Sequence, residues 1–184
     1  MSSKDGLYGR LLSRAQAVQV LFQAESAGRP AANVLEGEYV VTRGPIDEFG
    51  TSLALGVDEH RRELDQVIAH VANNWSLERL AHVDKDILRV ALYELLFSDE
   101  VSHAVAISEA VNLAKVFGGE DSYVFINGVL GRVSRDLDAG VDLLAESQPK
   151  PEPAPVPEPA VIEETVVEEE PVAEPEPASE EASQ

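Results

Sequence analysis

The chain has 184 residues, no cysteine and a formal net charge of −20 at pH 7. Without cysteine it forms no disulfide, no thiol nucleophile and no Cys-ligated zinc or iron–sulfur site. The excess of acid opposes an extended nucleic-acid surface, so any such surface must be local or completed by a basic partner. The sequence shows neither a signal-peptide pattern nor an apolar stretch of bilayer length, and we therefore expect a cytoplasmic protein without membrane contact.

Residues 149–184 differ from the rest of the chain in composition. They contain nine prolines, eleven glutamates and one lysine, a balance of −10 that leaves −10 for residues 1–148. Large apolar side chains are too few there to offset the entropy lost on ordering. The sequence therefore predicts one globular domain at 1–148 and a disordered, Pro/Glu-rich acidic tail at 149–184.

Helical periodicity begins near the N-terminus. Between residues 7 and 25 an apolar stripe predicts a helix that ends at Gly28 and Pro30; the stripe consists of Leu11, Ala15, Val18, Leu21 and Phe22. Arg10 and Arg14 lie one turn apart, and we expect both on the opposite, solvated face. Residues 30–41 predict a short second helix, and residues 46–72 predict a long one with weak points at Gly50 and Gly56.

Three further amphipathic patterns follow at residues 83–97, 106–117 and 121–137. Asp84 is the predicted N-cap of the first, and the pair Gly118 and Gly119 ends the second. The third carries Gly128 and Gly131 in mid-helix, which suggests a close approach by another helix because glycine costs about 1 kcal/mol there. The connection at 98–102 is short, which favours antiparallel neighbours.

No arrangement of catalytic residues is present in the sequence. The four histidines are scattered, and the chain has no metal-protease motif, no nucleophile elbow and no phosphate-binding loop. We therefore expect no enzymatic activity, no metal and no cofactor. Trp75 has two interpretations, as the closure of a core edge or as a platform for a nucleic-acid base.

Three runs of sequence carry a resemblance to a known family. They are residues 83–96, residues 106–115, and residues 121–131 with the run Asn127, Gly128, Val129, Leu130. In order and spacing they resemble the NusB family of bacterial transcription antitermination factors, over roughly residues 10–137. The resemblance implies an all-α domain of about seven helices in two antiparallel helical halves, an architecture that the helical patterns also favour.

The resemblance also implies a function. With the ribosomal small-subunit protein NusE, the family binds the boxA element of nascent ribosomal RNA and helps to assemble the antitermination complex on RNA polymerase. The first helix resembles the arginine-rich RNA-binding helix of the family, but here Leu11 and Leu12 follow Arg10. The sequence thus offers only a few basic residues for phosphate contacts.

Site residues follow by the same resemblance. The implied RNA-binding residues are Lys4, Arg10, Arg14, Phe117, Ser122 and Phe125. The implied partner-binding residues are Asp84, Glu109, Asn112 and Asp121. Read from the residues alone, the acids are also typical of helix caps and solvated faces, and both phenylalanines also fit the core stripe.

Other functions remain open at this point. One is a helical adaptor that binds NusE without useful RNA affinity, and another is the related RNA-binding module of ribosomal RNA methyltransferases. The apolar pair Leu11 and Leu12, expected to be exposed, could also form the contact of a homodimer. The tail could serve solubility alone, or its negative charge could compete with RNA for the basic residues of the first helix.

Overall fold

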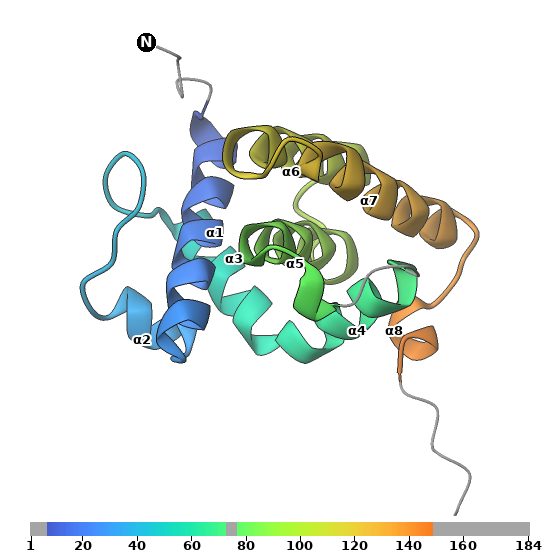
Figure 1. Ribbon diagram of the computed structural model, residues 1–184, viewed down its shortest axis with the longest axis horizontal. Helices are drawn as coiled ribbons and strands as arrows, with labels where there is room; N and C mark the ends of the chain where they lie inside the picture. Colours follow the sequence, from blue (N-terminus) through green and yellow to red (C-terminus); the bar gives the residue numbers. More distant parts are fainter. Residues whose placement is uncertain (1–6, 73–76, 149–184) are drawn as a thin grey trace, which may run out of the picture. The chain divides into compact units, whose positions relative to one another are not determined.

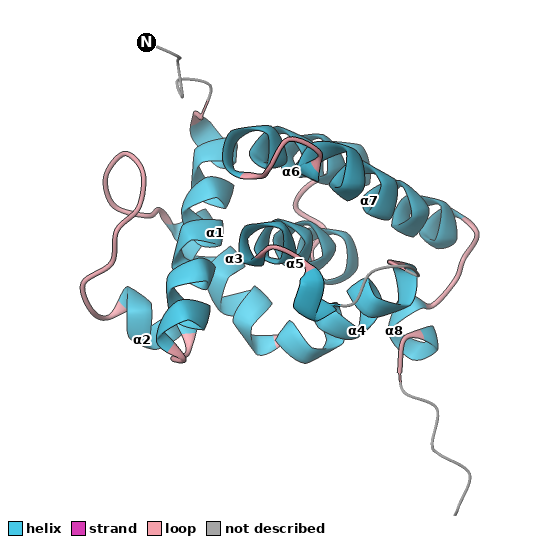
Figure 2. Ribbon diagram, in the orientation of Figure 1, coloured by secondary structure: helices cyan, strands magenta, loops and turns pink. Residues whose placement is uncertain are grey.

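The computed structural model describes residues 7–72 and 77–148, and within them helices joined by loops make up the fold (Figure 2). These residues form eight α-helices and one short 3₁₀ turn, and no strand. The elements are α1 (Gly9–Ala27), α2 (Ala31–Leu35), α3 (Glu48–Glu59), α4 (Arg61–Val71), η1 (Leu77–Arg79), α5 (His82–Phe97), α6 (His103–Phe117), α7 (Ser122–Asp138) and α8 (Leu143–Glu146). The predicted all-α fold is confirmed.

Helix α5 is the centre of the fold. It packs against α1, α3, α4, α6 and α7, and Figure 1 shows it in the middle of these helices. Eleven of its sixteen residues are buried, among them Ile87, Leu88 and Leu92. A helix that is buried on most of its circumference must pair its charged side chains inside the protein, because unpaired buried charge is costly.

Local sequence signals set several of the helix ends. Gly28 adopts a left-handed conformation with φ 60° and its N–H donates to the carbonyls of Ala24 and Glu25, which ends α1 as predicted. Asp47 caps α3, because its carboxylate accepts a hydrogen bond from the N–H of Gly50 at 2.8 Å. Asp142 caps α8, a short helix that the periodicity did not predict, in the same way.

Three predicted boundaries are wrong. The long helix at 46–72 divides at His60, where backbone angles of −95° and 13° separate α3 from α4. The second helix stops at Leu35, well before residue 41, and residues 38–47 are not helical. Helix α5 begins at His82, so Asp84 lies within its first turn and is not its N-cap.

The close helix approach also lies elsewhere than predicted. A Cβ atom built at Gly128 would have no neighbour within 4 Å, and one at Gly131 would meet only the tip of Arg135 at 4.0 Å. By contrast, a Cβ at Gly56 would overlap the ring of Tyr93. A glycine that a close approach requires therefore lies in α3, where it faces α5.

Some predicted features lie outside the described residues, namely Lys4, Trp75 and the acidic tail at 149–184. None of the described helices is long and apolar enough to cross a membrane.

Candidate nucleic-acid and partner interface

Arg10 is the exposed arginine of the predicted pair on α1. Its side chain is 53% exposed and pairs with Glu100 at 3.2 Å, a surface contact that contributes little to stability. Its guanidinium also lies over the ring of Phe49, 4.5 Å from the centroid. The aromatic face holds the side chain in place, while its exposure leaves it accessible to a phosphate.

Arg14 is buried, and the prediction that it lies on the solvated face of α1 is wrong. Its side chain is 2% exposed and its Nε and Nη2 donate to the two carboxylate oxygens of Glu94 at 2.8 and 2.7 Å. Its Nη1 lies 3.7 Å from Glu109. Arg14 precedes the buried Val18 by four residues, so its place on the apolar side was visible in the spacing.

Ser122 and Asp84 form a buried contact between the starts of α7 and α5. The Ser122 hydroxyl donates to Asp84 Oδ2 at 2.8 Å and accepts a hydrogen bond from the N–H of Gly119 at 2.8 Å. Each residue is only 8% exposed. The pair thus fixes the loop between α6 and α7, and neither side chain presents itself to a binding partner.

The other predicted partner residues do not form one cluster. Glu109 is 23% exposed and faces Arg14, whereas Asn112 is half-buried one turn further along α6. Asp121 is exposed at the start of α7, where its side chain makes no capping hydrogen bond. The structure therefore joins Glu109 to the first helix and leaves Asp121 accessible at the loop.

An apolar groove lies beside the partly buried Phe117. It has a volume of about 440 Å³. Its lining residues come from α1, the loop that follows α2, α5 and α6, and are Val18, Gln19, Phe22, Gln23, Val40, Val83 and Phe117. Phe22 is 45% and Val40 81% exposed, so Phe22, predicted for the core stripe, instead forms a surface. Phe125 is partly buried against the core, as its stripe predicted.

Periodicity did not reveal this groove. Val40 was predicted to lie in a helix, and only the fold brings it next to α1 and α6. A feature of this kind is typical of a protein-docking site, since exposed large apolar side chains gather on it.

A buried ion network lies around Arg89 on α5. Its guanidinium donates to Asp65 at 2.7 Å, to Glu25 at 2.8 Å and to Asp86 at 2.9 Å. Lys85 adds a contact to Glu25 at 3.1 Å. The network joins the end of α1 to α4 and α5, and its charged side chains pair with one another inside the protein.

This network changes the pKa values of its acids in opposite directions. Burial raises the pKa of Asp86 to about 6, although Arg89 opposes this shift. Burial would also raise the pKa of Glu25, but hydrogen bonds from Arg89 and Lys85 outweigh it and lower the pKa to about 2. In the described ranges no group of three or more His, Asp or Glu side chains could hold a metal ion.

The chain is similar to known proteins over most of its globular part. The sequence profile of the NusB family matches residues 12–135. The protein named Transcription antitermination protein NusB of Thermobifida fusca (strain YX) is 43% identical over 121 residues, which cover 66% of this chain and 85% of that protein. Its counterpart in Geobacter sulfurreducens is 42% identical over 131 residues, 70% of this chain and 95% of that protein.

Solved structures agree with these sequence matches. T. maritima NusB has a TM-score of 0.61 at 32% identity and covers 70% of this chain and 92% of its own. A chain from the crystal structure of antitermination factors NusB and NusE with dsRNA has a TM-score of 0.56, covers 68% of this chain and 96% of its own, and at 24% identity shows the fold alone. Because the family profile spans more than half of the sequence, the chain belongs to the NusB family.

Proposed function

We propose that this protein is a transcription antitermination factor. With NusE it binds boxA RNA of nascent ribosomal RNA transcripts and helps to assemble the antitermination complex on RNA polymerase. The observation that carries this proposal is membership of the NusB family, whose relatives at about 40% identity are named for that function. The protein would perform no covalent chemistry and would act in the cytoplasm, where nascent transcripts are.

RNA contact would begin at Arg10. Its guanidinium is exposed and rests on Phe49, so a phosphate could bind it with little loss of side-chain freedom. The proposed RNA-binding set also includes Lys4, Phe117 and Phe125. The buried Arg14 and Ser122 would not touch RNA but would hold the helices of the site in position. Single-stranded RNA suits such a site because its bases can leave the stack and meet partly exposed rings.

The partner NusE would dock at the apolar groove beside Phe117. Phe22 and Val40 supply exposed apolar surface, and Asp121 lies in the loop that follows Phe117. The net charge of −10 on residues 1–148 favours a basic partner, because complementary charge raises the association rate. The contribution of Asp84, Glu109 and Asn112 to NusE binding would then be indirect. They would fix the positions of α5, α6 and the loop between α6 and α7.

A second candidate function is a helical adaptor that binds NusE without useful RNA affinity. The burial of Arg14 favours it, because Arg10 alone then remains exposed of the two arginines predicted for α1. Affinity for RNA would in that case come almost entirely from the partner.

A titration of the full chain with boxA RNA distinguishes the two functions. It is made with and without NusE, at several salt concentrations and against a scrambled RNA. For the antitermination factor, NusE raises sequence-specific affinity, and Arg10→Ala weakens it by roughly fivefold at about 0.1 M salt. Arg62→Ala on α4 is the matched control. Binding of NusE without any specific RNA affinity identifies the adaptor.

A further inference from the structure

Three glutamines of α1 hold the loop that follows α2 in an extended form. The amide of Gln23 accepts a hydrogen bond from the N–H of Val40 at 3.0 Å and donates to the carbonyl of the same residue at 2.8 Å. One side-chain amide can meet both groups of one residue only where that residue is extended, since its N–H and C=O then point to the same side. Val40 is therefore held as in a β-ladder, with a helix side chain as its partner.

The same arrangement is repeated one step along the loop. Gln19 accepts from the N–H of Thr42 and donates to its hydroxyl, both at 2.8 Å. Gln16 donates to the carbonyls of Thr42 and Gly44 at 2.8 and 3.2 Å. These bonds explain why the predicted helix at 30–41 stops early: glutamines on α1 satisfy the backbone groups that a helix would otherwise pair.

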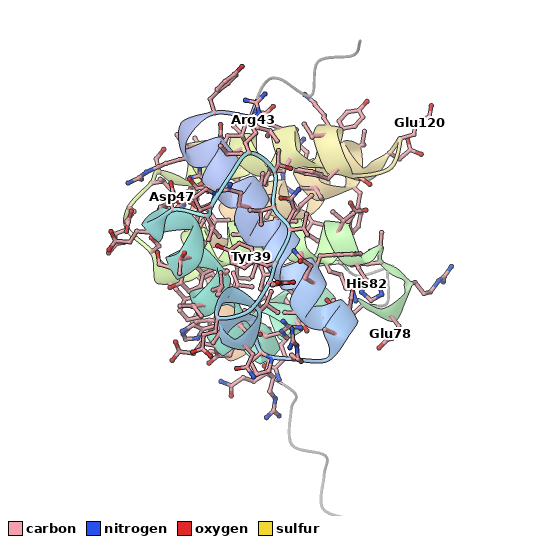
Figure 3. The ribbon with its side chains drawn as sticks, turned by 90° about the vertical axis from the view of Figure 1, so that its left-hand side faces the viewer. Tyr39, Arg43, Asp47, Glu78, His82 and Glu120 are labelled. Atoms are coloured by element: carbon pink, nitrogen blue, oxygen red, sulfur yellow. The ribbon has the colours of Figure 1, made fainter. Side chains whose placement is uncertain are left out.

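This fixed segment places Arg43 at the start of α1. Arg43 has a φ of 64°, an uncommon conformation for a residue with a side chain, and the fixed segment on its N-terminal side maintains it. Its Nη1 donates to the carbonyl of Leu7 at 3.1 Å, and its guanidinium lies 4.8 Å from the centroid of the Tyr8 ring. Figure 3 shows Arg43 at the end of the molecule where α1 begins, beyond Tyr39 on the same loop.

Arg43 and Tyr8 together have the composition of an RNA contact. Both residues are exposed, Tyr8 by 64%, and the guanidinium already lies over part of the Tyr8 ring. Stacking on an aromatic face pre-organises the planar guanidinium, so that less freedom is lost when it binds a phosphate. Arg10, two residues after Tyr8, provides a second guanidinium that is held on a ring in the same manner.

We infer that Arg43 and Tyr8 form an additional RNA-binding site, in which Arg43 binds a backbone phosphate and the Tyr8 ring stacks on a base of single-stranded RNA. Gln19 and Gln16 are positioning residues that keep Arg43 in place. The inference rests on the proposed RNA-binding function and deepens it. The pair of an exposed ring and a stacked arginine favours RNA over an acidic peptide, because a peptide would use the charge but not the ring.

Salt dependence of binding to boxA RNA by the full chain with NusE tests the site. Each phosphate contact to a single strand contributes about 0.7 to the slope of log K against log salt. Arg43→Ala should lower affinity by roughly fivefold at about 0.1 M salt and reduce the slope by about that amount. Arg43→Lys should keep the salt slope but bind RNA more weakly than wild type. Tyr8→Phe should bind RNA as wild type does, because the ring remains, whereas Tyr8→Ala should bind more weakly.

Gln19→Ala tests the positioning role. It should reduce the salt slope as Arg43→Ala does, and the double variant should lose no more than Arg43→Ala alone, because both act on one contact. A loss of general fold stability would lower the amount of active protein without changing the slope. Arg62→Ala, which removes the same charge from α4, should leave the slope unchanged.

Two results would overturn the inference while the proposed function stands. One is an Arg43→Ala variant whose RNA affinity and salt slope match those of Arg62→Ala. The other is an Arg43→Ala variant that binds NusE more weakly but, once saturated with NusE, binds RNA as wild type does. That result would assign the site to a protein partner. If wild type with NusE shows no specific RNA affinity, the proposed function and this inference are both wrong.

Discussion

Arg14 and Glu94 form an ion pair at the contact of α1 with α5, with both side chains almost wholly buried. Arg14→Ala leaves Glu94 as an uncompensated buried charge, and we expect it to lower the free energy of unfolding by about 3–5 kcal/mol. Urea denaturation followed by circular dichroism measures this loss. The double variant Arg14→Met with Glu94→Leu should recover most of it, because no unpaired charge then remains.

This test also separates stability from RNA contact at Arg14. The double variant should fold and, if NusE is present, bind boxA RNA as wild type does, because the Arg14 side chain is almost wholly buried inside the fold. A folded double variant with lost RNA affinity would show instead that Arg14 reaches the RNA.

Asp86 makes stability depend on pH between about 4 and 6. Burial raises its pKa to about 6 from an ordinary value of 3.8, so the folded protein retains a proton that the unfolded chain releases in this window. The contribution of Asp86 to stability is therefore fully present below pH 3.8, the ordinary pKa, and is lost as the pH rises through about 6, the pKa in the folded protein. Glu25 acts in the opposite direction: its pKa is lowered to about 2 from an ordinary value of 4.5, so its contribution is fully present above the ordinary value and is lost as pH falls, mostly below this window.

We expect Asp86→Asn to gain stability relative to wild type as the pH rises from 4 to 7, by about 1–3 kcal/mol. The asparagine does not titrate, and Arg89 keeps its bonds to Asp65 and Glu25. Urea unfolding of both proteins at several pH values gives the difference. A difference that is constant with pH would mean that Asp86 has an ordinary pKa.

At the scale of the elements, Gly56 sets how closely α3 approaches α5. A Cβ there would overlap the Tyr93 ring, which stacks with Phe97 at a centroid distance of 5.8 Å. We expect Gly56→Ala to cost about 1–3 kcal/mol because the ring and α3 must move apart. The matched change Gly128→Ala in α7 meets no neighbour and should stabilise by about 0.5–1 kcal/mol.

Thermal unfolding of the two alanine variants checks this contrast. The melting temperature should fall for Gly56→Ala and rise for Gly128→Ala. Equal and small changes at both positions would show that Tyr93 moves aside without cost and that α3 does not depend on the glycine.

For the whole molecule, charge is the property that governs encounter with RNA. Residues 149–184 carry −10 of the total −20. Deleting them should raise the association rate and affinity for boxA RNA at low salt, because less negative charge then repels the phosphates, and the gain should vanish near 1 M salt, where the screening length is about 3 Å.

Stopped-flow association across a salt series measures this gain. The control replaces the eleven tail glutamates with glutamines and keeps the length of the chain. It should behave like the deletion if charge is the cause. Unchanged rates at low salt for both variants would restrict the tail to roles other than competition with RNA.

Much of the candidate site could not be derived from the sequence. The exposed Arg10 was predicted from its neighbours on one helix, but Arg43 was not, because a loop residue has no periodicity that indicates its position. The groove at Phe22 and Val40 was missed because Phe22 was assigned to the core stripe and Val40 to a helix. Arg14 was assigned to the solvated face because of its charge, although its spacing to Val18 puts it on the apolar side; only the fold shows that α5 offers Glu94 as its buried partner.

The sequence by itself determined that the protein is all-helical, where most helices lie and which family the chain belongs to. These properties depend on local periodicity, on end signals such as Gly28, and on runs whose order and spacing resemble the family. Only the tertiary structure decided which charges are buried, where helices approach closely and how the 38–44 segment is held. Such features depend on pairs of residues far apart in the chain, for example Gln19 with Thr42 and Gly56 with Tyr93, whose contact exists only after folding.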